Sequence, residues 1–286
     1  DGGAIEAYYE ASPITVTNST FTSNSALHGS GGAMYNYYYV DLSLQGNTFT
    51  SNYAYSSGGA LYSYYLVYTE SVDDTFTGNT AERSYGGAIY QDAAYADYGD
   101  SSFTGTSIVG NTAGISGGGM LLNYQGTTVL DDMNIEGNTA SRDYGGGLYL
   151  YGNLDVTVTH STICGNTADE GGGVYSSATS GSATWENNVV QENTATYGAG
   201  ISFTTEHTLA FTNNTVVGND APKDGGGLYL YSAYGAFTNN LVAWSADGDG
   251  VVVDDTDSAT YSTFTYNGWY NNVSDDASGY VTTADL

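Results

Sequence analysis

Short runs in which apolar and polar residues alternate recur along the whole chain, for example at residues 61–64 and 154–158. An alternation with a period of two is typical of β-strands, and residues that favour turns (Gly, Asn and Ser) bound these runs. No window of 12 residues shows a convincing 3.6-residue period of an amphipathic helix. The pattern therefore predicts an all-β protein built from short strands.

One motif recurs along the chain with a nearly constant period. It is a glycine pair followed by a small residue and then an apolar one, and the apolar residue returns every 23–31 residues. The apolar positions are Ile5, Met34, Leu61, Ile89, Met120, Leu148, Val174, Ile201, Leu228 and Val251. The clearest glycine pairs are Gly31 and Gly32, Gly58 and Gly59, and Gly86 and Gly87. Such pairs suit a tight corner that needs a positive φ or a close backbone contact.

A second motif lies about ten residues before each glycine pair. It is an apolar residue, two small or polar residues and an asparagine, as in Phe21 to Asn24. The asparagines are Asn24, Asn52, Asn79, Asn111, Asn138, Asn166, Asn193 and Asn219, and a ninth copy carries Ser245 instead. Asparagine tolerates the left-handed backbone region, and equivalent asparagines can hydrogen-bond along a stack. We expect these residues to adopt that conformation and to form such a ladder.

Two motifs that keep one period predict a solenoid in which each period is one coil. A coil of about 26–28 residues with three short strands and three turns is the rung of a parallel β-helix. Residues 1–253 then form about ten coils, roughly 45–50 Å long at a strand spacing of ~4.8 Å. Residues 254–286 are expected to form an irregular final coil and a C-terminal cap. Because the chain opens in mid-motif at Asp1, the first coil is expected to need a preceding coil, a cap or a partner.

The paired GGA(I/L/V) and FxxN signatures resemble the repeats of chlamydial polymorphic outer-membrane proteins. More broadly, they resemble the right-handed parallel β-helix repeats of bacterial surface proteins and autotransporter passenger domains. The resemblance covers about residues 1–253 and rests on both motifs at one period. It implies a right-handed helix, an extracellular or cell-surface location and an adhesive or structural role.

The charge of the chain excludes some partners. The chain has 31 acidic and three basic residues and a net charge of −28. Binding to nucleic acid is excluded because it requires clustered Lys and Arg, and attraction to anionic lipid fails for the same reason. No run approaches the ~18 consecutive apolar residues of a membrane-spanning helix, so membrane insertion is not expected. A single cysteine, Cys164, rules out disulfides within the chain, and we expect it to point outward as an inert or oxidisable thiol.

Catalysis is the first alternative to a structural or adhesive role. Enzymes on β-helices combine carboxylates with a basic residue, but Arg83 and Arg142 occupy turns beside acidic residues, where surface ion pairs are expected. The three histidines, His28, His160 and His207, fall in different phases of the repeat, so no shared metal site is expected. The sequence therefore predicts a protein that is not an enzyme. A polysaccharide lyase or hydrolase stays an alternative.

Tyrosine marks the candidate contact surface. The residue after each inward apolar position should point outward, and six of ten such residues are tyrosines: Tyr35, Tyr62, Tyr90, Tyr149, Tyr175 and Tyr229. Two residues further on, a second column holds Tyr8, Tyr37, Tyr64, Tyr151 and Tyr231. Stacked tyrosines stabilise strand pairing, and exposed ones favour partner binding. The two interpretations are compatible. The partners would be other copies or domains of the protein, or surface glycans and proteins, so a carbohydrate-binding module is the second alternative.

Two further kinds of site are expected from local residue patterns. Asp247, Asp249, Asp254, Asp255 and Asp257 gather five carboxylates near the weakened end of the repeat, where calcium is a candidate ligand. Acidic turns that only keep the protein soluble are the alternative. The motifs at Asn18, Asn213 and Asn272 are glycosylation acceptors if the host has that machinery.

Overall fold

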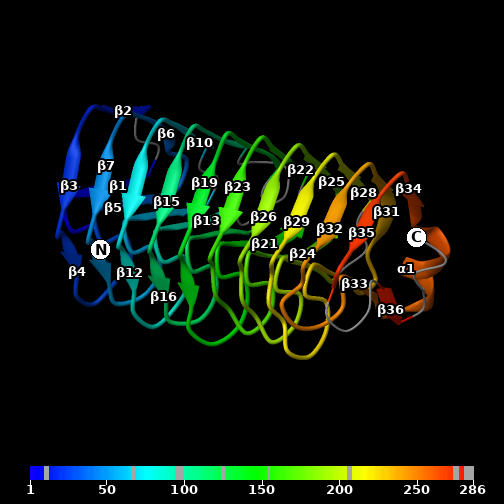
Figure 1. The fold of residues 1–286 in the computed structure, drawn as a ribbon. Helices are drawn as coiled ribbons and strands as arrows, with labels where there is room; N and C mark the ends of the chain where they lie inside the picture. Colours follow the sequence, from blue (N-terminus) through cyan, green and yellow to red (C-terminus); the bar gives the residue numbers. More distant parts are fainter. Residues whose placement is uncertain are drawn as a thin grey trace.

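The computed structural model describes residues 1–9, 13–65, 68–93, 100–123, 126–153, 155–204, 208–272 and 277–279. The chain winds through successive coils along one axis, so that the N-terminal coils and the C-terminal coils lie at opposite ends of a rod (Figure 1). Each coil contributes one strand to each of three long sheets, and neighbouring strands of a sheet are parallel. This arrangement confirms the predicted all-β parallel solenoid.

Sheet A contains the strand that follows each glycine pair. Among the described residues its order is β1 (Ile5–Tyr8), β5 (Met34–Tyr37), β9 (Leu61–Tyr64), β13 (Ile89–Asp92), β17 (Met120–Asn123), β21 (Leu148–Asn153), β24 (Val174–Ser180), β27 (Ile201–Phe203), β30 (Leu228–Leu230), β33 (Val251–Val253) and β36 (Ala277–Gly279). The strands pair in the register that the repeat predicts, since Leu61 faces Met34 on one side and Ile89 on the other.

Sheets B and C follow sheet A within each coil. Sheet B holds β2 (Ile14–Thr17), β6 (Asp41–Gln45), β10 (Tyr68–Val72), β14 (Ser101–Thr104), β18 (Thr127–Asp131), β22 (Asp155–Thr159), β25 (Ser182–Glu186), β28 (Thr208–Thr212), β31 (Tyr234–Thr238) and β34 (Thr263–Thr265). Sheet C holds β3 (Thr20–Thr22), β7 (Thr48–Thr50), β11 (Thr75–Thr77), β15 (Ser107–Val109), β19 (Asn134–Glu136), β23 (Thr162–Cys164), β26 (Val189–Gln191), β29 (Thr215–Val217), β32 (Leu241–Ala243) and β35 (Gly268–Tyr270).

A fourth sheet corrects the prediction of three strands per coil. Sheet D consists of two-residue strands in the order β20 (Thr139–Ala140), β16 (Thr112–Ala113), β12 (Thr80–Ala81), β8 (Tyr53–Ala54) and β4 (Ser25–Ala26). The alternation of apolar and polar residues over two positions is too short to be recognised as a strand from sequence. In the next coils the same position continues as isolated bridges, for example between Thr139 and Thr167.

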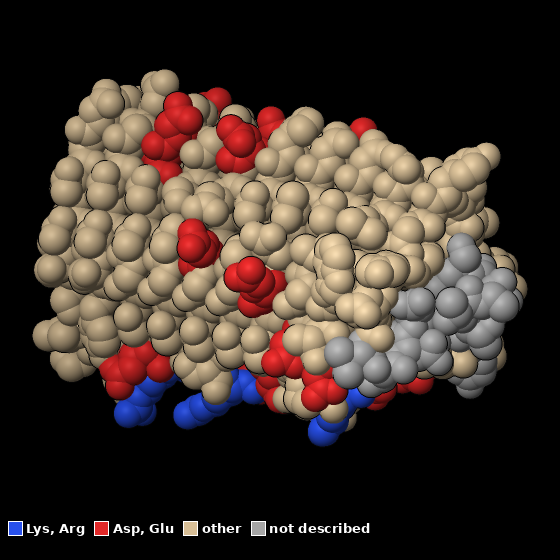
Figure 2. All heavy atoms as spheres, viewed as in Figure 1, with Lys and Arg blue, Asp and Glu red and all other residues tan. Residues whose placement is uncertain are grey.

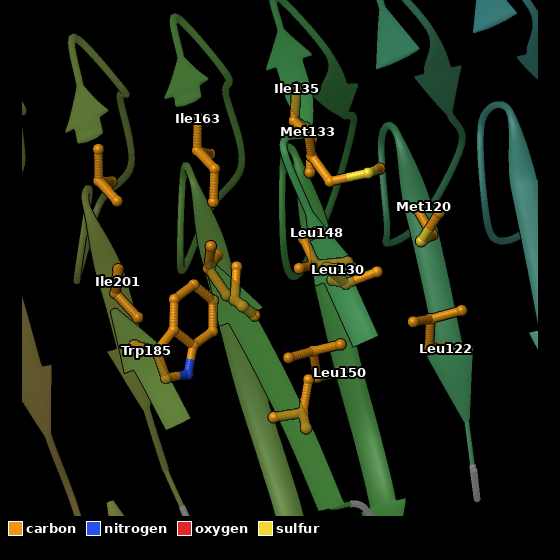
Figure 3. Close-up of a cluster of buried hydrophobic side chains, with 14 of the residues drawn as sticks. Met120, Leu122, Leu130, Met133, Ile135, Leu148, Leu150, Ile163, Trp185 and Ile201 are labelled. Carbon is orange, nitrogen blue, oxygen red and sulfur yellow. The ribbon is translucent and has the colours of Figure 1, made fainter. Parts of the chain in front are cut away.

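The core is a single stack of inward side chains from sheets A, B and C. Met120 and Leu122 come from β17, Leu130 from β18 and Ile135 from β19, and all are buried (Figure 3). Trp185 on β25 is the bulkiest fully buried side chain, and its ring meets Phe203 edge to face at 5.9 Å. Because each inward face is covered by the coils on either side, no coil can bury its apolar residues alone.

The two glycines of each pair are needed for different reasons. The first has a positive φ, +68° at Gly31 and +65° at Gly58, a region that favours glycine. The second lies against the next coil, and a Cβ on Gly32 would lie 2.0 Å from the carbonyl oxygen of Gly59. The glycine pair therefore sets both the direction of the corner and the close spacing of the coils.

The asparagine ladder forms as predicted, and it is buried over most of its length. Each side chain accepts from the backbone N–H and from Nδ2 of the asparagine one coil earlier, at about 2.9 Å in the central coils. Nδ2 also donates to a backbone carbonyl of the earlier coil, as from Asn138 to Ile108. The expected left-handed conformation is wrong for these residues. It belongs to the preceding residue, for example Ser51 or Gly78, because that residue makes the turn itself.

A second ladder, which the sequence analysis did not predict, runs along the turn between sheets B and C. Asn188, Asn214, Asn240 and Asn267 hydrogen-bond from coil to coil in the same way. In the N-terminal half the same position is occupied by different polar residues, including Asn47 and Asp74. The two ladders together hold both turns that flank sheet C.

The chain beyond Val253 continues the solenoid. Asp255 caps the short helix α1 (Thr256–Tyr261) by accepting from the N–H groups of Asp257 and Ser258. Strands β34, β35 and β36 then add one more strand to sheets B, C and A. Residues 280–286 of the expected C-terminal cap lie outside the described residues.

Candidate functional site

The tyrosines of sheet A form two columns in register across the coils. Tyr35, Tyr62 and Tyr90 face one another on successive strands, and their ring centroids are 5.0 and 5.1 Å apart with nearly parallel planes. The ladder resumes at Tyr149 and Tyr175, whose rings are 5.2 Å apart. The sequence analysis thus predicted the register of this first column correctly.

The first column is more buried than the sequence analysis assumed. Tyr35 and Tyr175 are each only 9% exposed, and Tyr62 and Tyr90 are half-buried. Burial raises the pKa of Tyr35 and of Tyr175 to about 12. The first column points outward as expected, but the rings of neighbouring tyrosines cover much of Tyr35, Tyr62 and Tyr175. These tyrosines act mainly as a ladder that supports strand pairing.

The second column is exposed at its two ends and half-buried between them. Tyr8, Tyr37 and Tyr64 stack at 4.8 and 5.5 Å, and Tyr8 is 49% exposed. Tyr151 is half-buried, and Tyr231 is exposed at the far end of the same column.

A third column, absent from the sequence analysis, follows directly in the first three coils. Its members Tyr9, Tyr38 and Tyr65 stack at 4.9 and 4.5 Å. All three have a positive φ, which is uncommon for a bulky residue. Their spacing of 29 and 27 residues in the sequence was the signal that could have revealed them.

Comparison with families of known proteins matches residues 65–242 to the right-handed β-helix region. This match covers more than half of the chain. The chain belongs to the right-handed β-helix family. Residues 48–64 also match the repeat of the Chlamydia polymorphic membrane protein, the family whose motifs the sequence resembles. Neither the curated proteins nor the solved structures that were searched gave a match.

Membership of the right-handed β-helix family supports the handedness predicted from the repeat. Together with the polymorphic membrane protein repeat, it indicates a surface or autotransporter-type passenger protein. Within the part of the chain that the structure describes, no helix has the length and apolar character to cross a membrane.

Charge is distributed unevenly over this β-helix. Much of the face seen in Figure 2 is uncharged, and the Lys and Arg side chains gather along its lower edge among acidic residues. Arg83 lies over the ring of Tyr55 at 4.8 Å, and Lys223 lies over the ring of Tyr197 at 4.7 Å. These cation–π contacts hold two of the three basic side chains at that edge.

Three of the five aspartates proposed for calcium serve separate contacts. Asp255 caps α1, Asp254 accepts from the hydroxyl of Tyr229 at 2.7 Å, and Asp247 accepts from the N–H of Gly248. Among the described residues, no three His, Cys, Asp or Glu side chains are grouped so that they could hold a metal ion. The expectation that Asp247, Asp249, Asp254, Asp255 and Asp257 converge is therefore wrong, and calcium binding by any of them stays a prediction.

The other candidate residues lie at separate places on the rod. His160 pairs with Asp131 at 2.9 Å in an exposed turn, His28 is exposed, and His207 lies outside the described residues. Cys164 is half-buried on the outer side of β23, as predicted, and burial raises the pKa of its thiol. Asn18 and Asn213 are exposed in turns, which suits glycosylation acceptors, although Asn213 Oδ1 accepts from Nδ2 of Asn239 at 2.6 Å. Asn272 instead accepts from the backbone N–H of Ser245, and residues 273–274 of its motif lie outside the described residues.

Proposed function

We propose that this β-helix is an extracellular, non-enzymatic domain that acts by adhesion at a cell surface, with sheet A as its contact face. The observation that carries the proposal is the exposed tyrosine surface of the first three coils, where Tyr8, Tyr9 and Tyr39 are 46–59% exposed. Tyrosine combines a large apolar ring with a hydrogen-bonding hydroxyl and costs little entropy to order, so it is enriched at interfaces. A stacked array fixes these rings before a partner arrives, which lowers the cost of binding.

A rigid rod suits this role. One asparagine ladder runs from Asn24 to Asn219 and a second from Asn188 to Asn267. Together with one continuous core they hold the coils in a rod, so a contact at one end is held at a fixed distance from the other. We expect a partner that is not strongly anionic, because 28 net negative charges repel such surfaces.

The proposal is tested with beads that carry the protein, applied to epithelial cells, collagen, fibronectin and immobilised neutral or acidic polysaccharides. We expect retention on at least one of these surfaces and at least a fivefold loss for the variant Y8S/Y37S/Y64S. The matched control Y261S/Y266S/Y270S removes three exposed tyrosines from other faces and should retain binding. Absence of retention on every surface, or equal loss in both variants, would contradict the proposal.

The enzyme alternative is tested on the same immobilised polysaccharides. Release of reducing ends or unsaturated sugars from the polysaccharides would show a lyase or hydrolase and overturn the non-enzymatic assignment. Other copies of the chain are the second class of partner, tested by sedimentation velocity at 0.15 M and 1 M NaCl. Charges repel one another over about 8 Å at 0.15 M salt but only about 3 Å at 1 M salt. Self-association should therefore appear only at the higher NaCl concentration.

A further inference from the structure

At two interior coils of sheet A, neither of the first two columns carries a tyrosine. In β17 the two column positions carry Leu121 and Asn123, and in the coil of β27 they carry Ser202 and Thr204. The strands on either side carry tyrosine in at least one of the two columns, so each interruption is a missing rung in an aromatic stack. Neighbouring coils are ~4.8 Å apart, so the tyrosines that flank a missing rung are ~10 Å apart along the axis.

Each missing rung forms a hollow in the surface. The first, the Leu121 hollow, has a volume of about 320 Å³ and lies between Tyr85 and Tyr90 on one side and Tyr149 and Tyr151 on the other. The second, the Thr204 hollow, has a volume of about 350 Å³ and lies between Tyr175 and the pair Tyr229 and Tyr231. Both volumes fall within the range of small-molecule sites. The hollows are three coils apart on one face, or ~14 Å.

The width of a missing rung suits a flat ring. Leu121 is 5% exposed and forms the floor of the first hollow, so a ring can lie only on its outer side. A six-membered ring placed there, midway between the flanking tyrosines, would lie ~4.8 Å from each, which is within the separation of stacked rings. The ladder itself shows that this face holds rings at such a spacing, since Tyr62 and Tyr90 are 5.1 Å apart.

Polar groups beside each hollow suit a ligand with several hydroxyls. At the Leu121 hollow, Asn123 and the hydroxyl of Tyr90 both donate to Asp92 at 3.0 Å. At the Thr204 hollow, Ser202 donates to Glu170 at 2.8 Å, and Thr204 donates to the hydroxyl of Tyr175 at 3.0 Å. Carboxylates accept hydrogen bonds from sugar hydroxyls, and amide and hydroxyl groups both donate and accept. Neither hollow is lined by Lys or Arg, so neither provides a cation for an acidic sugar.

We infer that the Leu121 and Thr204 hollows are two binding sites for a neutral glycan, each of which takes one pyranose ring in place of a missing tyrosine rung. This inference rests on the proposed adhesive function and names its ligand class. The apolar face of the sugar packs on the tyrosine walls, and its hydroxyls reach the polar groups of the interrupted strand. The net charge of −28 disfavours polyuronates and other anionic chains.

The test fills the missing rungs with the residue that neighbouring coils carry. L121Y completes the first column between Tyr90 and Tyr149 and closes the first hollow. T204Y extends the second column from Tyr231 into the second hollow. The control E6Y adds a tyrosine to the first column beside Tyr35, away from both hollows. Melting temperatures of all variants should equal or exceed that of the unmodified chain, which shows that they fold.

Binding is measured by isothermal titration calorimetry with cellohexaose, chitohexaose and mannohexaose, and with hexagalacturonate as the anionic comparison. We expect at least one neutral hexasaccharide to bind with a Kd below about 1 mM, and L121Y/T204Y to weaken it at least tenfold while E6Y leaves it within twofold. A double variant that binds within twofold of the unmodified chain would overturn the inference. So would tighter binding of hexagalacturonate, or the absence of binding by all three neutral sugars.

The bead assay separates this inference from the proposed function. If beads that carry L121Y/T204Y still adhere as well as the unmodified protein, adhesion uses the exposed tyrosines elsewhere on sheet A and the glycan sites are not its cause. If the unmodified protein binds soluble sugar but its beads adhere to no surface, the adhesive function fails while the two sugar sites stand.

Discussion

The asparagine ladder allows a quantitative prediction for Asn138, which lies near its centre. The Asn138 side chain takes part in four hydrogen bonds of 2.9 Å: Nδ2 donates to the carbonyl of Ile108 and to Oδ1 of Asn166, and Oδ1 accepts from the N–H and Nδ2 of Asn111. An intramolecular hydrogen bond contributes about 1 kcal/mol net, and a buried group left without a partner costs about 1–3 kcal/mol. Since Asn111 is fully buried, N138A leaves its N–H without a partner. The four lost hydrogen bonds account for about 4 kcal/mol and the unpaired N–H for a further 1–3 kcal/mol, so we expect N138A to lower the free energy of unfolding by about 5–7 kcal/mol.

Urea unfolding followed by circular dichroism measures this loss, with N134A as the matched control. Asn134 lies four residues earlier in the same coil, on the outer side of sheet C, and its one side-chain contact is a long 3.4 Å hydrogen bond to Ser107. Its removal should change stability by less than about 0.5 kcal/mol. Hydrogen exchange should show that the loss is greatest in the coils next to Asn138, because each coil is stabilised mainly by its neighbours.

A loss below about 1 kcal/mol for N138A, with an unchanged denaturant slope, would refute the reasoning. The ladder would then follow from the backbone turn and contribute little stability of its own. N138D adds a second check, since it keeps an accepting oxygen but places a carboxylate beside the Ile108 carbonyl and Asn166 Oδ1. It should be more destabilising at pH 7 than at pH 4, where the carboxyl is more often protonated.

Three further predictions concern charge and ionisation. Burial raises the pKa of Asp74, so its folded-state cost appears as pH rises above the unfolded value and is complete above the folded one. D74N should therefore stabilise the chain at pH 7 and have no such effect near pH 3, measured by urea unfolding. Because burial raises the pKa of Tyr35 and Tyr175 to about 12 and unfolded tyrosines ionise near 10, stability should fall as pH rises past 10. Ultraviolet titration should then show these rings ionising only as the strand signal is lost; ionisation of all tyrosines near pH 10 in a folded chain would contradict this. NaCl should raise the melting temperature by screening the net charge of −28. Calcium should raise it no more than magnesium does at equal ionic strength. A larger effect of calcium would support the calcium site predicted from the sequence.

The repeat allowed the fold to be predicted in detail because the register of a parallel solenoid is the alignment of its coils. Once Leu61 is equivalent to Ile89, their strands must pair, and every residue between the two motifs falls into a column. The same logic placed the asparagine ladder. It did not reveal the second ladder, because that column changes from asparagine to Asp74 and Thr106 in the N-terminal half and so lacks a constant residue.

The candidate site was less predictable, because alternation gives the direction of a side chain but not what covers it. Tyr35 points outward as expected, yet it is almost fully covered by the stacked rings of Tyr8, Tyr37 and Tyr62. The expectation that the aspartates near residue 250 converge was wrong for a different reason. They are close in sequence, but a corner and the start of α1 direct Asp254 and Asp255 to different partners.

The missing tyrosines lower the stability of the fold, and this loss indicates what the interruptions are for. A tyrosine at Leu121 would meet Tyr90 and Tyr149 on either side, and each aromatic pair is worth about 0.5–1.5 kcal/mol beyond the area it buries. The chain thus forgoes roughly 1–3 kcal/mol at Leu121, while six of the ten positions of the first column carry tyrosine. Repetition stabilises a solenoid, so positions that depart from the repeat at a cost in stability are those where a binding function is expected. L121Y should therefore be more stable than the unmodified chain but bind glycan more weakly. A hollow with only a structural role would not make stability rise while glycan affinity falls.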